Sequence, residues 1–563
     1  RYSRVARDCG DMKIILVFLA LAASVPAYAR SPAAPQDPLA EENATEDKIP
    51  DGATLEAEGA VIGRIVLHKE NVFDTANPAE NNALYRLANR WHIVTRDSVL
   101  RQQLLFREGD RFSRRLVAES ARLLRRNSYL YDAEVVPFHY ENGVVDIEVR
   151  TRDMWTLNPG LSVSRSGGEN KTRMSLSESN LLGRGARLRF AYVDDVDRQS
   201  TTVEFSDANL GHSWASLYLG FSDMSDGYSS RVSLVRPFFA LDARWSAGFD
   251  FLDDSREERL YDLGNEVAEF QHETDYFAAF GGWSAGLRGD FARRWTAGVV
   301  YDDQRFSEVA DPTLPNVFPE DRRLLYPFIG FELVEDRYET TSNRDQIGRT
   351  EDFYLGRSVT ARLGYASDSF GSDRDSIIYS IDASQGFGSI SQKALILAAG
   401  ASGRIDDGAS ANAEIDIAAR FYNQISSKRL FFMTVAARFG HELDLDNPIE
   451  IGGDSGLRGY PLRYQAGDRS VLFTIEKRYF TDWYPFRLVR VGGAVFADVG
   501  RTWGENPVGG PSLGWLKDVG FGLRLGPTRG GGRNVIHVDI AFPLDGDPTI
   551  DDVQILLESK SSF

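Results

Sequence analysis

From Trp155 to the end of the chain, the sequence consists of short segments in which small or polar side chains alternate with apolar ones. Gly, Asp, Asn and Ser separate these segments, and no helical period of useful length runs through them. Examples are RLRFAYV, WASLYLGF, RVSLVRPF, RWSAGFDF, WTAGVVY, NAEIDIAARF and VIHVDIAF. Because successive side chains of a strand point to opposite faces, this part of the chain is predicted to be all-β.

Such alternation is typical of a soluble β-sandwich as well as of a transmembrane β-barrel. A sandwich, however, buries its apolar faces between two sheets and seldom runs unbroken over so long a stretch. Sixteen strands over residues 153–563 allow about 26 residues per strand and connection, which is typical of outer-membrane barrels. A direct count of strand-like segments gives about 20, so the number of strands stays open at this point.

Aromatic residues recur at the ends of these segments, for example Trp214, Trp245, Tyr326 and Trp483. Girdles of aromatic side chains mark both membrane boundaries of a barrel. The chain also ends in an aromatic residue, Phe563, which is usual for the closing strand of such barrels. A mean hydropathy of −0.31 excludes a bundle of apolar transmembrane helices, so the pattern favours an antiparallel transmembrane barrel.

The start of the chain predicts export. A lysine and an apolar run, together residues 13–23, precede an A-x-A sequence at residues 27–29. These are the parts of a secretory signal peptide, and a buried core helix is the less favoured interpretation. Residues 1–29 are therefore predicted to be upstream residues and signal peptide. Residues 30–58, rich in Pro, Ala and acidic side chains, are predicted to be a disordered linker.

Cleavage after Ala29 would remove Cys9, the only cysteine, so no disulfide is expected in the exported chain. It would also remove four basic and two acidic residues, which moves the formal net charge from −18 to −20. So acidic a chain is a poor nucleic-acid binder. Its seven histidines form no H-E-x-x-H sequence and have no cysteine partners, and neither a metal site nor a cofactor is predicted.

Residues 59–152 differ from the rest in their pattern of apolar and polar residues and predict a small α+β domain. Apolar residues at helical spacing alternate here with strand-like runs, within a segment long enough for one compact core. The last two strands are expected to form a hairpin across Asn142-Gly143, because Asn-Gly favours tight hairpin turns. The expected elements, in order, are a strand over 61–67, helices over 98–105 and 113–126, and strands over 135–140 and 144–150.

The stretch IGGDSGLRGYP, residues 451–461, allows two interpretations. Its Gly-Asp-Ser-Gly sequence is similar to the nucleophile segment of a serine protease, with Ser455 as nucleophile. That chemistry needs a histidine base and an orienting acid, and no other part of the chain is similar to a protease's histidine segment. Leu457 also stands where such proteases carry a further glycine. We therefore predict no catalytic residue and no enzymatic activity.

In the second interpretation, a glycine-rich loop delivers Arg458 to acidic partners. In the segment RSVLFTIEKRYF, alternation puts Glu476 opposite the mostly apolar face, and in VGGAVFADVGRTWG it does the same for Asp498. Both carboxylates are therefore expected to face the barrel lumen. A guanidinium can bridge two carboxylates with paired hydrogen bonds, which lysine cannot do. The alternative is that each charge simply faces lumenal water.

These residues resemble motifs of a known family. Leu457-Arg458-Gly459-Tyr460 resembles the V-R-G-[FY] loop motif of the bacterial outer-membrane assembly superfamily that includes BamA, TamA and the two-partner-secretion translocators. Phe496-Ala-Asp498-Val-Gly500 resembles its F-x-D-x-G strand motif, and Glu476 falls on the acid that these proteins carry one strand earlier. ESNLLGRG resembles a turn near the start of the family's barrel, and FREGDRFSRRLVAESARLLRRNSYL resembles a POTRA domain.

The resemblance implies a single POTRA-like domain over 59–152 in the periplasm and a 16-stranded barrel over 153–563 in the outer membrane. It implies that Arg458 docks on Asp498 and Glu476 from the sixth extracellular loop, aided by the other loop and strand motif residues. BamA-like proteins carry several POTRA domains, so accessory subunits stay an open question.

The same resemblance implies the assembly, insertion or translocation of unfolded client proteins at the outer membrane. Clients would add to the sheet edge near 135–140 and to a weak seam between the first strand, near 155–166, and the last, near 552–563. Two alternatives stay open. One is a dedicated secretion pore for a single partner protein, and the other is a surface structural barrel without transport activity.

Overall fold

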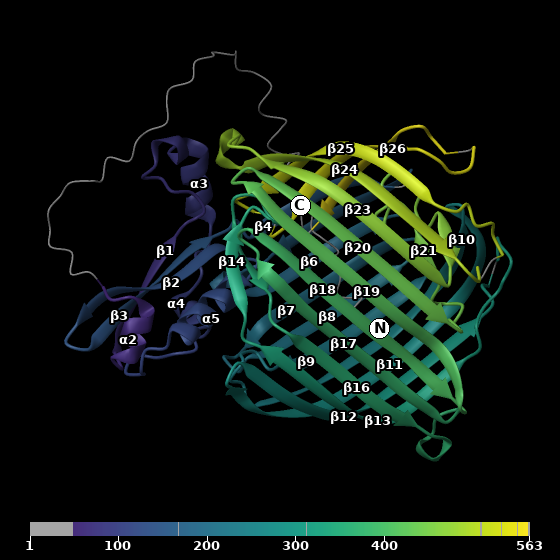
Figure 1. Cartoon of the computed structure of the whole chain (residues 1–563), viewed down its shortest axis with the longest axis horizontal. Helices are drawn as coiled ribbons and strands as arrows, with labels where there is room; N and C mark the ends of the chain where they lie inside the picture. The colour runs from purple at the N-terminus through teal and green to yellow at the C-terminus, as the bar shows by residue number, and fades with distance from the viewer. Residues whose placement is uncertain are drawn as a thin grey trace, which may run out of the picture. The chain divides into compact units, whose positions relative to one another are not determined.

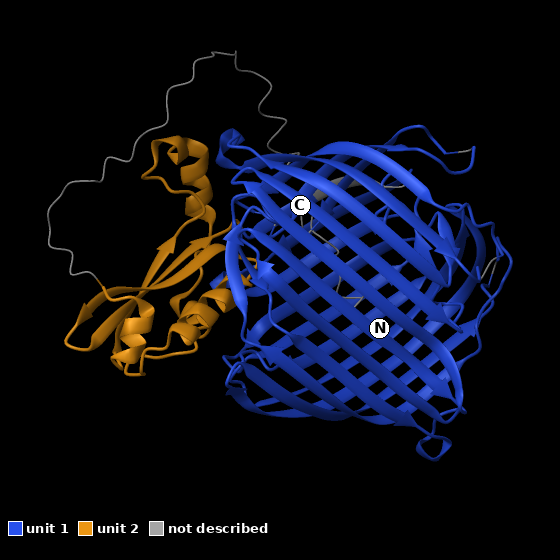
Figure 2. Ribbon diagram, viewed as in Figure 1, with its two compact units in different colours: residues 1–12, 156–563 blue, residues 13–155 orange. Residues whose placement is uncertain are grey.

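The computed structural model describes residues 49–166, 168–310, 312–506, 509–530, 532–548 and 550–560. The predicted signal peptide, most of the predicted linker and Phe563 lie outside these residues. The described chain forms two compact units that divide between Trp155 and Thr156 (Figure 2). The predicted boundary lies three residues earlier, between 152 and 153.

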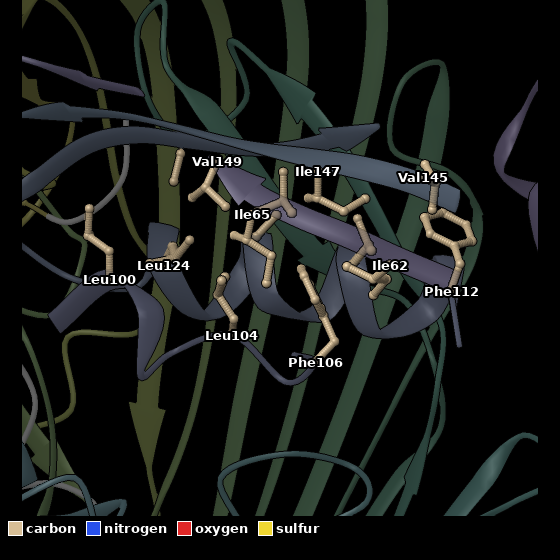
Figure 3. Close-up of a cluster of buried hydrophobic side chains, with 14 of the residues drawn as sticks. Ile62, Ile65, Leu100, Leu104, Phe106, Phe112, Leu124, Val145, Ile147 and Val149 are labelled. Carbon is tan, nitrogen blue, oxygen red and sulfur yellow. The ribbon is translucent and has the colours of Figure 1, made fainter. Parts of the chain in front are cut away.

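The first unit is a three-stranded sheet packed on helices. The sheet has the order β1-β3-β2, with β1 parallel and β2 antiparallel to β3. Its core lies between the sheet and α5, where Ile62, Ile147 and Leu124 meet (Figure 3). The elements are α2 (Gly52–Ala57), β1 (Val61–Glu70), the 3₁₀ helix η1 (Pro78–Glu80), α3 (Ala83–Trp91), α4 (Asp97–Arg101), α5 (Arg114–Arg125), β2 (Leu130–Glu141) and β3 (Val144–Asp153).

Two features of this unit differ from the sequence prediction. The predicted linker ends earlier than residue 58, because α2 forms there: the Asp51 carboxylate caps it by accepting the Thr54 N–H at 2.8 Å, and Leu55 is fully buried in the core. The helix α3 lies between β1 and α4, in a stretch for which no helix was predicted. The predicted order of strand, helix, helix, strand and strand is otherwise present.

The second unit is a closed antiparallel barrel (Figure 1). Within the described residues, twenty strands close the ring, so the 16 strands expected from the family resemblance are wrong and the direct count of segments is right. In chain order the barrel strands are β4 (Leu157–Ser166), β5 (Glu169–Glu178), β6 (Ala186–Asp194), β7 (Gln199–Leu210), β8 (Ala215–Met224), β9 (Gly227–Arg236), β10 (Trp245–Asp262), β11 (Asn265–Arg288), β12 (Phe291–Ser307), β13 (Arg322–Glu335), β16 (Ser358–Ala366), β17 (Ser376–Ser389), β18 (Lys393–Asp406), β19 (Ala409–Ser426), β20 (Arg429–His441), β23 (Arg469–Phe480), β24 (Val489–Trp503), β25 (Leu516–Pro527), β26 (Val535–Pro543) and β27 (Gln554–Lys560).

Short turns explain the larger number of strands. Only three residues separate β17 from β18, and two separate β18 from β19. Each strand with its connection therefore uses about 20 residues rather than the 26 or so of the 16-stranded estimate. Three of the connections contain a short 3₁₀ helix: η2 (Leu181–Gly183), η3 (Asp368–Phe370) and η4 (Pro485–Arg487).

The two faces of the barrel wall differ as alternation requires. Ile415 and Ile417 of β19 are about half exposed on the outer face, whereas Glu414, which precedes Ile415, is 8% exposed on the inner face. Exposed tryptophans lie side by side on three neighbouring strands, because Trp283 pairs with both Trp245 and Trp295. Among the described residues, no helix has the length and apolarity needed to cross a membrane.

Two connections of the barrel carry hairpins of their own, at opposite ends of the barrel (Figure 1). We call residues 442–468, between β20 and β23, the lock loop; they contain β21 (Ile449–Ile451) paired with β22 (Gln465–Gly467). We call residues 338–354, between β13 and β16, the inner hairpin; it is formed by β14 (Tyr338–Ser342) and β15 (Thr350–Tyr354). If only the connections at the lock loop's end of the barrel are counted, starting from β4, the lock loop is the eighth. The family resemblance implies the sixth.

The buried core of the first unit gives a test of its packing. Leu124→Ala should lower that unit's free energy of unfolding by about 2–5 kcal/mol, because it opens a cavity at a fully buried site. Leu84→Ala on α3, where the side chain is 50% exposed, is the control and should change the free energy by about 0.5 kcal/mol or less. Urea titration of the full chain, followed by protease cleavage within residues 49–155, measures both. Equal effects would contradict the assigned core.

Candidate functional site

The centre of the candidate site is the guanidinium of Arg458, which lies inside the barrel and is held by two carboxylates. Its Nε and Nη2 donate to Asp498 Oδ2 and Oδ1 at 2.7 and 2.9 Å, and its Nη1 donates to Glu476 Oε1 at 2.7 Å. All three residues are at most 4% exposed. The contact that the sequence predicts between this arginine and the two acids is therefore present.

Strand register brings the two carboxylates together. On the neighbouring strands β23 and β24, Glu476 pairs with Phe496 and Thr474 pairs with Asp498, so the two acids lie on a diagonal of the inner face. Diagonal neighbours on one face of an antiparallel pair are close enough for long side chains to meet. A single guanidinium from the lock loop thus reaches both acids, and neither charge is left alone inside the barrel.

The apolar and glycine positions of the two motifs fit around this arginine. The guanidinium carbon of Arg458 lies 3.4 Å from the centre of the Phe496 ring, a cation–π contact. Leu457 is fully buried, and a Cβ at Gly500 would lie 3.1–3.3 Å from the side chains of Leu472 and Leu457. The glycine therefore leaves the room that the lock loop occupies.

Gly459 and Tyr460 fix the loop to the next part of the wall. The Gly459 N–H donates to Asp518 Oδ2 at 3.0 Å, and a Cβ at Gly459 would lie 2.6 Å from the Asp518 Cβ, so a side chain does not fit. The Tyr460 hydroxyl lies 2.6 Å from Asp545 Oδ1 and accepts the Lys517 N–H at 2.8 Å. Asp518 and Asp545 were not predicted from the sequence.

Ser455 shapes the turn that leads to Arg458. Its hydroxyl accepts the Gly452 N–H at 2.7 Å and donates to the Gly452 carbonyl at 3.1 Å. This is the local hydrogen bonding that serine commonly supplies in turns. The next residue, Gly456, has φ of +119°, a conformation that favours glycine. The contacts of Ser455 are thus those of a turn residue.

A second arginine, Arg478 of β23, extends the site toward the other end of the barrel. Its Nε donates to Glu476 Oε2 at 2.9 Å, and its Nη1 donates to the Arg344 carbonyl at 2.8 Å and to Asp345 Oδ1 at 3.2 Å. Arg344 and Asp345 belong to the inner hairpin. Alternation puts Glu476 on the inner face but assigns no role to Arg478 on that same face, and nothing in the loop sequence indicates the hairpin.

The outer part of the lock loop is held by other connections at its end of the barrel. Arg463 donates to both carboxylate oxygens of Asp197, each at 2.8 Å, and stacks on the Tyr261 ring of β10. The β10–β11 turn also touches the loop: a Cβ at Gly264 would lie 2.8 Å from Pro461 Cβ. Leu263 of the same turn packs against the buried cluster around Tyr460.

Burial makes this cluster of charges depend on all its members. An ion taken out of water loses several kcal/mol of hydration, which only well-placed partners and hydrogen bonds offset. Removing one partner from a buried pair commonly costs about 3–5 kcal/mol, because it leaves a charge without compensation. The docked position of the lock loop is therefore expected to depend strongly on Arg458.

Comparison with known proteins finds no matching family model and no matching curated protein. Among solved structures, the chain is similar to BamA from Haemophilus ducreyi lacking POTRA domains 1–3, at 14% identity and a TM-score of 0.37, covering 88% of this chain and 84% of that one. It is also similar to CdiB from Acinetobacter baumannii (12% identity, TM-score 0.45, covering 89% and 74%) and to CdiB from Escherichia coli (11%, 0.44, 88% and 76%).

The buried cluster predicts unequal effects for two residues of one loop. Arg458→Ala should destabilise the docked lock loop by about 3–5 kcal/mol, because it leaves Asp498 and Glu476 buried without their shared cation. Ser455→Ala removes only local turn bonds and should cost about 1 kcal/mol. Protease cleavage within residues 442–468 of the purified full chain measures loop release. Equally small effects of the two substitutions would contradict the assignment.

Exchange of the charges gives a second test. In Arg458→Glu the new acid meets two carboxylates, so the loop should be released completely. Adding Asp498→Arg should restore part of the docking, because a bidentate pair re-forms with reversed polarity. Recovery should stay incomplete, since Glu476 still repels the new acid. Cleavage of the double variant at the rate of the single one would show that the two residues do not act as a pair.

Proposed function

We propose that the chain is an outer-membrane barrel of the BamA/TamA type that assembles, inserts or translocates client proteins. The observation that carries the proposal is Arg458, docked by a loop motif on Asp498 and Glu476 inside a closed barrel. Residues 59–152 act as a single POTRA-like domain in the periplasm. No covalent bond is made or broken in this scheme, so it requires no catalytic residue and no cofactor.

The outer face of the barrel supports the placement in a membrane. Its exposed side chains include large apolar residues on many of the strands, such as Ile415 of β19 and Phe521 of β25. The row formed by Trp245, Trp283 and Trp295 is typical of the aromatic girdle at a membrane boundary. The chain enters the barrel at Leu157, at the end opposite the lock loop. With the first unit in the periplasm, as proposed, the lock loop would face the cell exterior.

The seam between the first and last strands supports a role in client handling. β27 pairs with β26 along an unbroken antiparallel ladder, from the pair of Val535 with Lys560 to the pair of Ala541 with Gln554. Between β27 and β4, by contrast, the described residues show a single ladder pair, Leu557 with Arg165. An unpaired strand edge is costly in lipid, so an edge opened here would accept a strand of a client protein.

The sheet of the first unit supports a place where clients are received. In the order β1-β3-β2, the two outer strands are β1 and β2. The outer edge of β1 is already engaged, since Ile62 exchanges 2.8 Å backbone bonds with Gly109 and Asp110. The edge of β2, which includes the predicted residues 135–140, is therefore the better candidate for addition of a client strand.

One observation favours a dedicated secretion pore as a second candidate function. A barrel of twenty strands encloses a wider lumen than one of sixteen, because barrel diameter grows with strand number. In that case the client passes through the lumen, and both internal loops have to leave it. The two functions differ in where the client touches the barrel: at the seam, or on the inner wall.

Photocrosslinking in living cells tests the proposal. A crosslinker at Ile555 of β27, which is 54% exposed beside the seam, should capture client proteins. The matched control is Ile415 of β19, which is equally apolar and 50% exposed but lies far from the seam in the strand order. Equal capture at both positions would contradict assembly at the seam. Capture from an inner-wall position such as Thr474 alone would favour the secretion pore.

A further inference from the structure

The inner hairpin enters the lumen from the end opposite the lock loop. Ile347 of the hairpin and Leu355, the residue after β15, are at most 4% exposed. They pack in one cluster with Tyr422, Phe432 and Ala494, which come from β19, β20 and β24. In the ring order these strands lie three to six places beyond β16, next to which the hairpin is rooted. The hairpin therefore packs against the inner wall well beyond its own neighbouring strands.

Polar contacts fix the hairpin tip at its far side. Gln346 Nε2 donates to the Arg533 carbonyl at 2.7 Å, and Arg349 Nη1 donates to the Gly532 carbonyl, both in the β25–β26 connection. Within the tip, the Glu351 carboxylate accepts the backbone N–H groups of residues 344–346 at 2.8–3.1 Å. The tip is thus a preformed element that docks as a unit rather than a loose loop.

A continuous row of ionic hydrogen bonds connects the tip with the lock loop. From Asp345 the row runs through Arg478 at 3.2 Å to Glu476 at 2.9 Å, and on through Arg458 at 2.7 Å to Asp498 at 2.7 Å. Glu476 is the shared member, because one of its oxygens binds Arg478 and the other binds Arg458. Arg478 also stacks on Phe432 at 3.8 Å, as Arg458 does on Phe496.

The order of charges determines what happens when one member leaves. The row holds two cations and three anions. Without Arg458, Arg478 is the one cation left within the row for its three carboxylates. Glu476, on which Arg524 also acts, then competes more strongly with Asp345 for Arg478. A released lock loop also lets water reach the Glu476–Arg478 pair and weaken it, because charges attract less in a medium of high dielectric constant. Both effects loosen the inner hairpin.

We propose that the lock loop and the inner hairpin form one coupled closure of the lumen, in which release of either loop at its own end weakens the docking of the other through Glu476 and Arg478. Coupling between two sites is reciprocal in free energy. Release of the lock loop therefore weakens the docking of the inner hairpin by the same free energy as release of the inner hairpin weakens the docking of the lock loop. The closure needs no client, and its test is independent of the function proposed above.

Cysteine accessibility tests the coupling in the purified full-length barrel with Cys9 replaced by serine. Ile347→Cys reports on the inner hairpin and Leu457→Cys on the lock loop; both positions are at most 4% exposed. Arg458→Ala, which removes a residue of the lock loop alone, should raise the maleimide labelling rate at position 347 by about ten-fold. Asp345→Lys, which places a cation against Arg478, should raise the rate at position 457 by a similar factor.

Arg438→Ala is the matched control. Arg438 is an inward arginine of the neighbouring strand β20 whose bonds run to Glu414 and Asp416 within the wall. It should leave both labelling rates unchanged. If Arg458→Ala fails to form the barrel, Arg458→Lys replaces it, since lysine keeps the charge but cannot bridge both acids, and the Asp345→Lys arm stands on its own. The proposal is overturned if either variant exposes its own loop while the reporter on the other loop labels at the parent rate.

Discussion

A guanidinium kept away from water is the constraint around which the barrel interior is organised. Arg458 lies on a loop, where an arginine would ordinarily be solvated, yet it is 4% exposed and has every polar contact supplied by the wall. Such an arrangement is stable only in its complete form, since a partly compensated buried ion is worse than none. The loop is therefore expected to be either fully docked or fully released, with little in between.

Small residues make this docking possible as much as the charges do. Gly459 lies against Asp518 where a Cβ would lie 2.6 Å from that residue's Cβ, and Gly500 leaves room for Leu457. A side chain at Gly459 would displace the loop that carries Arg458 without changing any charge. The two motifs thus specify one docked shape, in which polar and steric requirements are met by the same few positions.

The sequence predicts some parts of this structure well because their physics is local. Alternation along β23 and β24 fixes the faces of Glu476 and Asp498, and the family resemblance then pairs both acids with Arg458. Direct segment counting gives the strand number, whereas the family resemblance does not, since short turns such as the one between β18 and β19 make the difference.

The parts that the sequence does not predict depend on contacts between distant segments. Asp345 and Arg478 lie 133 positions apart, and neither the hairpin's sequence nor its length indicates that it turns into the lumen. The helix α2 is an intermediate case: Asp51 as cap and Leu55 as core residue are visible in the sequence, but a composition rich in Pro and acidic residues around them favours a linker.

The long β10–β11 hairpin has a practical consequence for anyone who wishes to display a peptide on this barrel. Surface turns usually accept insertions, and the tip at Leu263-Gly264 is an obvious place for an epitope tag. Here, however, Leu263 packs on the cluster around Tyr460 and Gly264 lies against Pro461, so the tip is packed against the lock loop. The Asp407-Gly408 turn between β18 and β19, where a Cβ at the glycine would meet no atom within 4 Å, is the better site for a tag.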